Sequence, residues 1–109
     1  MKTFRFITLL YMCWVTTLCF AADDTQVAIW GAGSRSCGYW SENRKNKAIY
    51  YQLRQWALGY ISAYNFTHKK RQFQAVDEEA IIASIDKICG ERPRAIIAGA
   101  LLIMTKDID

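Results

Sequence analysis

The sequence predicts a small all-α domain of four helices that is stapled by one disulfide. Two observations lead to this prediction. Apolar residues recur three or four positions apart along most of the chain, and no stretch sustains the apolar–polar alternation that is typical of a strand. Beyond its first 21 residues the chain also holds only two cysteines, Cys37 and Cys89, so only one pairing is open to them.

The first 21 residues have the composition of a secretory signal peptide. Lys2 and Arg5 form a charged start, an apolar stretch of 15 residues follows at positions 6–20, and Cys19-Phe20-Ala21 places small residues where a signal peptidase cleaves. A helix that spans a membrane needs about 20 apolar residues. We therefore favour cleavage after Ala21 over a retained membrane anchor, and we expect the protein in the periplasm.

The remaining residues, 22–109, are expected to form a single domain. Export would remove Cys13 and Cys19 and place the other two cysteines in an oxidising compartment, where thiols pair. A bridge across about 50 residues stabilises a fold by about 4 kcal/mol. The exported residues carry twelve Lys and Arg against ten Asp and Glu, a net charge of only +2. So small an excess argues against a nucleic-acid partner.

The first helix is predicted from Cys37 to about Lys45, with Ser34 or Ser36 as its N-cap. A loop at Gly31-Ala32-Gly33-Ser34 precedes it. A phosphate-cradling role for the two glycines is a weaker alternative, because such a site also needs a preceding strand and a following lysine or helix start.

The second helix, from about Lys47 to Phe66, has the most regular pattern. Its apolar residues share one helical face and lie at positions 49, 53, 56, 57, 60, 61 and 64. Gly59 lies in the middle of this segment. Because an interior glycine costs about 1 kcal/mol relative to alanine, we expect another segment to pack closely against its backbone.

A third helix is predicted to start at Asp77, where Glu78 and Glu79 place negative charge in the first turn. Val76 and Ile81 are spaced for a hydrophobic staple at this start. Gly90 follows the apolar face of this helix and would end it in the left-handed conformation.

A fourth helix is predicted to open at Pro93, since proline is favoured in a first turn. Its residues from Ala95 to Met104 are apolar nearly all round. In so small a domain such a helix is either central or partly exposed on a binding surface, and a homodimer is one alternative.

The sequence offers little for catalysis. His68 is the single histidine, and it lies in a basic run, His68-Lys69-Lys70-Arg71, away from any recognisable nucleophile. Paired cysteines cannot act as nucleophiles, and two thiols with one histidine make a poor zinc site. We therefore expect no enzyme activity, no metal and no cofactor.

Binding to another protein is the function that the residues favour, because exposed aromatic and basic side chains are typical of such surfaces. Two alternatives remain for the end of the second helix. The basic run can simply oppose the negative end of the helix dipole, and Asn65-Phe66-Thr67 matches a glycosylation acceptor sequence. The predicted partner-binding residues are Trp30, Tyr50, Tyr51, Lys69, Lys70 and Arg71.

Three short patterns span most of the predicted domain: Cys37-Gly38-x-Trp40, Trp56-x-x-Gly59-Tyr60 and Asp86-x-x-Cys89-x-x-x-Pro93. This layout resembles two kinds of small periplasmic helical protein, the HdeA/HdeB acid-stress chaperones and the Rap1a/Tai immunity proteins. The segment from Gly59 to Ala63 is similar to the Gly-Tyr segment in the central helix of the immunity proteins. Two further cysteines that usually accompany that pattern are replaced here by Ala57 and Met104.

The resemblance implies a protein that binds other proteins without catalysis. One expectation is an immunity protein that neutralises a secreted toxin. The alternative is a periplasmic chaperone of the HdeA type, a holdase that captures unfolded clients in acid. A small hydrolase is a third and less favoured alternative.

Overall fold

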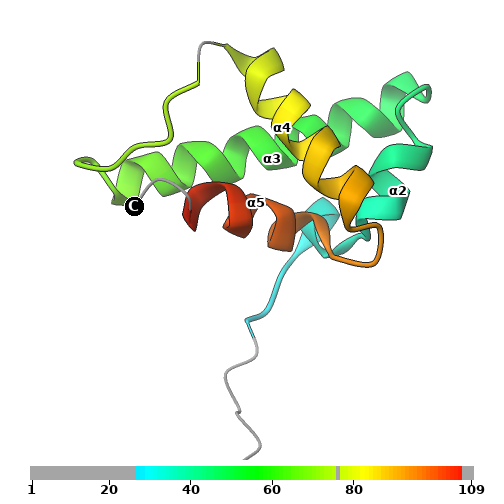
Figure 1. Cartoon of the computed structure of the whole chain (residues 1–109), viewed down its shortest axis with the longest axis horizontal. Coiled ribbons are helices and arrows are strands. Elements are labelled where there is room, and N and C mark those ends of the chain that lie inside the picture. The colour runs from blue at the N-terminus through cyan, green and yellow to red at the C-terminus, as the bar shows by residue number, and fades with distance from the viewer. Residues whose placement is uncertain (1–26, 76, 107–109) are drawn as a thin grey trace, which may run out of the picture.

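The computed structural model describes residues 27–75 and 77–106, and in them it confirms the all-α fold and the Cys37–Cys89 disulfide. A 3-10 turn, η1 (Gly31–Ser34), precedes four α-helices. These are α2 (Cys37–Glu42), α3 (Lys47–Thr67), α4 (Glu78–Glu91) and α5 (Ile97–Lys106). Figure 1 shows α3 as the long spine of the domain, with α5 beside its C-terminal half and α4 reaching across toward α2.

Three helices begin at a side chain that caps them. Ser36, Asn46 and Asp77 each accept a hydrogen bond from the backbone N–H three residues further on, which satisfies one of the free donors of a helix start. Of the two serines proposed as the first cap, Ser36 has this role. Ser34 instead donates from its hydroxyl to the carbonyl oxygen of Gly31, within η1. The predicted loop at residues 31–34 is therefore a 3-10 turn.

Two predicted helix ends are wrong. The first helix ends at Glu42, and residues 43–45 form a turn instead of continuing to Lys45. Gly90 does not end α4, which continues through Glu91 because the N–H of Arg92 still reaches the carbonyl of Ile88. Gly90 is therefore an ordinary helical residue.

The prediction that Pro93 opens the last helix is also wrong, because α5 begins four residues later, at Ile97. The segment between α4 and α5 is used to hold the start of α2. The N–H groups of Cys37 and Gly38 donate to the carbonyls of Ala95 (2.7 Å) and Pro93 (3.0 Å), and Ile97 N–H donates to Arg35 (2.9 Å). We call this pairing of residues 35–38 with 93–97 the backbone clasp.

The close backbone contact expected at Gly59 lies elsewhere. No atom of another segment comes within 4 Å of the position that a Cβ on Gly59 would take. At Gly33, by contrast, a Cβ would lie 2.0 Å from the ring of Trp56. The position where only glycine fits is therefore in η1, and the substitution Gly33→Ala is the one that would force a clash.

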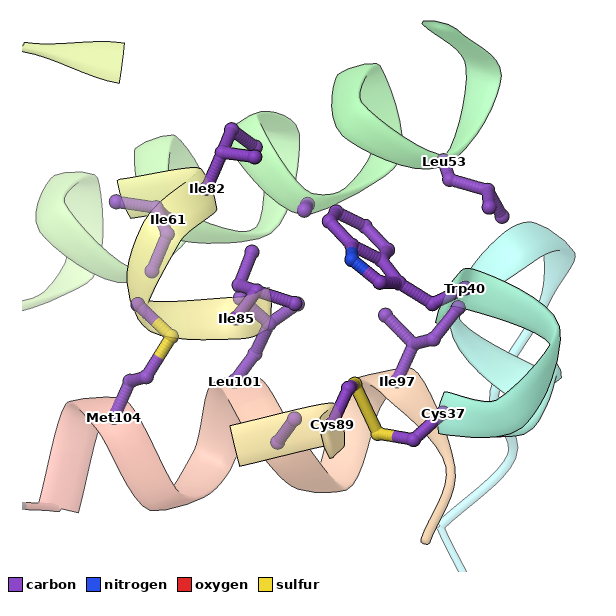
Figure 2. Packing of buried hydrophobic residues seen from close by; sticks show 12 residues of the cluster. Cys37, Trp40, Leu53, Ile61, Ile82, Ile85, Cys89, Ile97, Leu101 and Met104 are labelled. Atoms are coloured by element: carbon purple, nitrogen blue, oxygen red, sulfur yellow. A yellow bond between two sulfur atoms is a disulfide. The ribbon is translucent and has the colours of Figure 1, made fainter. Parts of the chain in front are cut away.

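The core lies where all four helices meet next to the disulfide. Trp40 reaches from α2 into its centre, and Figure 2 shows this ring with Leu53 of α3 on one side and Ile97 and the disulfide on the other. Further from α2, Ile85 of α4 faces Leu101 of α5. The largest fully buried side chains are Trp40, Ile85, Ile97, Leu101, Cys37 and Cys89.

The apolar helix α5 (Ile97–Lys106) is central in the domain, which was one of the two alternatives predicted for it. Six of its ten residues are buried, and the hydroxyl of buried Thr105 is satisfied by the carbonyls of Leu101 and Leu102. Leu102 on its outer side is 48 % exposed. One side of α5 therefore forms the core while the other faces solvent.

Several predictions concern residues outside the described part of the chain. These are the signal peptide at residues 1–21 with Cys13 and Cys19, and the contribution of Val76 to a hydrophobic staple. Among the helices that the structure describes, none combines the length and the apolar character that crossing a membrane requires.

Candidate functional site

Two carboxylates of α4 join this helix to its neighbours. Asp86 accepts a hydrogen bond from the indole N–H of Trp40 (2.7 Å), and its other oxygen lies 3.0 Å from the guanidinium of Arg44. Because the Asp86 side chain is mostly shielded from solvent and Arg44 is not, the bond to the buried indole is the more stabilising of the two. This cluster therefore serves the fold.

Glu79 makes the second connection, an ion pair with Arg54 of α3. The hydrogen bond from Arg54 to Glu79 raises the pKa of the guanidinium further, so Arg54 stays charged. The same guanidinium lies 5.7 Å from the ring centre of Tyr50. Tyr50 in turn packs edge-on against Trp40, with the ring centres 5.5 Å apart.

The structure separates the predicted partner-binding residues along α3. Trp30 is 84 % exposed and lies beside the middle of α3, where its carbonyl accepts from Trp56, and Tyr51 is 64 % exposed near the N-terminal end. Tyr50 differs from its neighbour, because it is half-buried against Trp40. Lys69, Lys70 and Arg71 are exposed beyond the other end of α3. The helix has 21 residues, so its two ends lie about 30 Å apart.

Trp30 is held in place through its backbone while its ring stays in solvent. The indole N–H of Trp56 donates to the carbonyl oxygen of Trp30, at 3.0 Å. The Trp56 ring rests on Gly31 and Gly33, and Gly31 has a φ of +78°, which glycine adopts without strain. The two glycines therefore leave room for the Trp56 ring. This packing role explains why glycine occurs at both positions, and a phosphate-binding role is not needed to explain it.

Next to Trp30 the surface is hollowed by a pocket of about 620 Å³, which we call the η1 groove. Apolar side chains from η1 and α3 line it together with hydrogen-bonding groups and one cation. The lining residues are Gly31, Ala32, Ser34, Arg35, Tyr39, Ile49, Gln52 and Leu53. The accessible surface of this groove is more polar than apolar, so it would hold a partner mainly through hydrogen bonds and the charge of Arg35.

Arg35 is the charged residue of the η1 groove, and hydrogen bonds hold its backbone on both sides. Its backbone N–H donates to Ala32 in η1, and its carbonyl accepts from Ile97 in the backbone clasp. Its guanidinium lies 4.9 Å from the ring centre of Tyr39, a cation–π contact. The groove therefore presents a positive charge whose backbone is fixed from two sides.

At the other end of α3 the last helical residues, Phe66 and Thr67, and the six residues after them form a compact segment, residues 66–73, which we call the basic loop. Asn65 closes it, since its side-chain oxygen accepts from Phe73 N–H (2.7 Å) and its amide donates to the Phe73 carbonyl (3.1 Å). Within the loop, Arg71 N–H donates to His68 and the amide of Gln72 donates to Lys69. The loop is therefore shaped by its own hydrogen bonds.

The remaining chemical candidates of the sequence have structural roles in the described residues. His68 stacks on the Tyr64 ring with its Nδ1 2.9 Å from the Tyr64 carbonyl, at the end of α3. The Asn65 side chain, which a glycan would modify, has both its polar atoms bonded to Phe73. Nowhere in residues 27–75 and 77–106 do three metal-ligating side chains gather.

The η1 groove itself was not predicted. Arg35 and Tyr39 are four residues apart at the start of a helix, and this spacing is a signal that could have suggested their contact. The groove also needs Leu53 to lie opposite η1, which depends on the packing of two segments far apart in sequence. Phe66, which is 76 % exposed, was missed because the α3 pattern placed it at the edge of an apolar helix.

Comparison with protein families, with curated proteins and with solved structures found no match for this chain. The geometry of the η1 groove and of the basic loop is therefore the basis for the functional inference.

Proposed function

We propose that the protein is exported and binds one specific protein partner through the η1 groove and Trp30, in the manner of an immunity protein. The observation that carries the proposal is the fixed, solvent-exposed Trp30 beside a groove that holds Arg35 over Tyr39. Tryptophan and arginine are the residues most enriched among those that dominate binding energy in interfaces.

Preorganisation supports this proposal. Trp56 holds the Trp30 backbone, and the backbone clasp and the disulfide hold Arg35 and the start of α2. Binding costs entropy for each side chain or loop that becomes ordered, so a surface that is ordered in advance binds more tightly. The same contacts that stabilise the fold therefore also fix the shape of this groove.

Charge points to an acidic partner. Residues 22–109 carry a net charge of only +2, but the residues that line the η1 groove include Arg35 and no acidic side chain. A positive surface speeds association with a negative one and discriminates against other partners. We expect the partner to place a carboxylate on Arg35 and an apolar side chain against the half-buried Ile49.

The test starts with the exported protein as bait in an extract of its own host, followed by titration calorimetry with the purified partner. Trp30→Ala and Arg35→Ala should each weaken binding about 30-fold or more, as residues of a binding centre do. Lys47→Ala, an exposed residue outside the groove, is the control. Equal affinity for all three variants, or the absence of a stoichiometric partner, would contradict the proposal.

A second candidate function, an acid-activated holdase, is favoured by one observation. The side-chain contacts described above that join α4 to α2 and α3 are made by carboxylates, Asp86 and Glu79, and the N-cap of α4 is the carboxylate of Asp77. At about pH 2 carboxyl groups are protonated and these contacts weaken. The disulfide would still hold α4 to α2 while the apolar face of α5 became accessible.

This alternative is tested by dye binding and by light scattering of an aggregating client at pH 2–3. The double variant Asp86→Asn and Glu79→Gln removes both charges at neutral pH and should bind the dye there if the loosened state is the active one. An unchanged circular dichroism spectrum from pH 7 to pH 2, with no protection of the client, would reject the holdase and leave the specific binder.

A further inference from the structure

The basic loop combines exposed charge with an exposed aromatic ring at one tip of the molecule. In Figure 1 the loop after α3 projects at the edge of the domain, beyond the helices. Phe66 is 76 % exposed, and the Lys69 ammonium lies 5.6 Å from the centre of its ring. Lys70 and Arg71 follow directly and are exposed as well. The η1 groove lies against the N-terminal half of α3, and Trp30 lies beside its middle.

The two phenylalanines of this loop have different environments. Phe73 is half-buried and packs against the core cluster, so its apolar surface stabilises the fold. Phe66 directly follows Asn65, whose side chain forms the clamp on the backbone of Phe73. The Phe66 ring is nevertheless exposed to solvent. The fold therefore does not require the Phe66 ring, and its exposure next to a lysine calls for another explanation.

We infer that the basic loop docks on a membrane surface that carries anionic phospholipids. An aromatic ring beside ammonium groups matches the boundary between acyl chains and headgroups, where rings lie in the interface and lysines reach the phosphates. Basic residues near an anionic bilayer each contribute to attachment. The residues from Phe66 to Ala75 include no acid that would oppose this contact.

The shape of the tip favours a lipid surface over an acidic protein. The hollow between Phe66 and Arg71 is lined by these six consecutive residues alone, so it is a dimple on a projecting loop. A protein interface of ordinary size needs about 800 Å² on each partner, and a single short loop offers much less. A membrane can accept one tip, because its phosphates repeat across a plane. The inference is independent of the function proposed for the η1 groove.

The test uses the protein from residue 22 to residue 109 and vesicles in a sedimentation assay, with phosphatidylcholine alone or mixed with an equal part of phosphatidylglycerol. The protein should bind the anionic vesicles more strongly, and salt should weaken this binding. Each lysine near an anionic surface changes the binding constant about fivefold, so Lys69→Gln with Lys70→Gln should lower it about 25-fold. Phe66→Ala should lower it about fivefold.

The matched control is Lys45→Gln with Lys47→Gln, which makes the same change in net charge at the other end of α3. It should change binding less than about threefold, since its charges lie outside the contact. Asn65→Ala is a further variant that leaves the charge unchanged but removes the clamp, and it should weaken binding because the loop loses its shape. Circular dichroism confirms that each variant is folded.

Three results would overturn the inference. The first is equal binding to anionic and neutral vesicles. The second is an equal loss in the control pair, which would assign the effect to net charge. The third is binding to soluble polyglutamate without binding to vesicles, which would assign the loop to an acidic protein.

Discussion

The two ends of α3 are built in different ways. At the end with η1 and α2, segments distant in sequence are joined by the disulfide, the backbone clasp and the Trp56 ring on Gly33. At the other end, the basic loop depends on contacts within nine residues, from Asn65 to Phe73. Contacts between distant segments stabilise the whole fold, whereas contacts within a loop determine only its shape. The comparison predicts global effects at one end and local effects at the other.

The largest effect should come from the disulfide. Cys89→Ser removes a bridge between residues 52 apart in sequence and should lower the free energy of unfolding by about 4 kcal/mol. Urea denaturation of the purified protein measures this change. Cys37→Ser should produce the same loss, because both variants lack the same bond. A loss of less than about 1 kcal/mol would mean that the backbone clasp and the core suffice at this end.

Gly33→Ala should be the next most harmful change at the same end. The new Cβ would lie 2.0 Å from the Trp56 ring, which cannot move without breaking its hydrogen bond to Trp30. Overpacking of this kind costs about 3 kcal/mol. A double-mutant cycle supplies the control, because in a Trp56→Ala background the same substitution should have little effect. Equal costs in both backgrounds would show that the ring is not the obstacle.

Asp86→Ala should lower the free energy of unfolding by about 2 kcal/mol, because it leaves the buried indole N–H of Trp40 without an acceptor. Asp86→Asn retains an acceptor oxygen and loses only the ion pair with exposed Arg44. It should therefore cost about 1 kcal/mol or less. Thermal melting at neutral pH compares the two. The same cost for both variants would show that the ion pair, and not the indole contact, is the stabilising one.

At the loop end, Asn65→Ala should lower the free energy of unfolding by only about 1 kcal/mol, although it removes two hydrogen bonds. The amide protons of the basic loop should exchange much faster, while those of α4 and of the core keep their protection. Hydrogen exchange detected by mass spectrometry measures both regions in one experiment. Faster exchange at Trp40 and its neighbours would contradict the division between the two ends.

The approximate positions of the four helices could be predicted from the periodicity of apolar residues, and the start of α4 from Asp77, while Ser36 was one of two candidate caps for α2. The ends could not be predicted in the same way. Gly90 and Pro93 have strong local preferences for a helix stop and a helix start. Neither preference decides the outcome, because the residues after α4 form a turn whose backbone is hydrogen-bonded to residues 35–38.

The candidate sites show the same limit. The exposure of Trp30 and of Lys69 and Lys70 followed from composition and from the place of these residues beside a helix. The η1 groove exists only because η1 packs against a helix that begins many residues later, and no local pattern reports such a contact. Tyr50 and Tyr51 are adjacent in sequence, yet only the packing of Trp40 makes one half-buried and leaves the other exposed.

The smallest expected effect concerns Gly59, between the two ends of α3. Nothing approaches the position of its missing Cβ, and the residue is exposed. Gly59→Ala should therefore raise the free energy of unfolding by about 0.5–1 kcal/mol, since alanine loses less backbone entropy in a helix. Gly90→Ala, in an equally open position of α4, should give a similar gain and serves as the control.

If Gly59→Ala destabilised the protein while Gly90→Ala did not, a second copy of the chain would be the surface that approaches Gly59. Sedimentation velocity would then find a dimer that the substitution weakens. A gain at both positions instead means that no other segment or copy packs against α3 at Gly59.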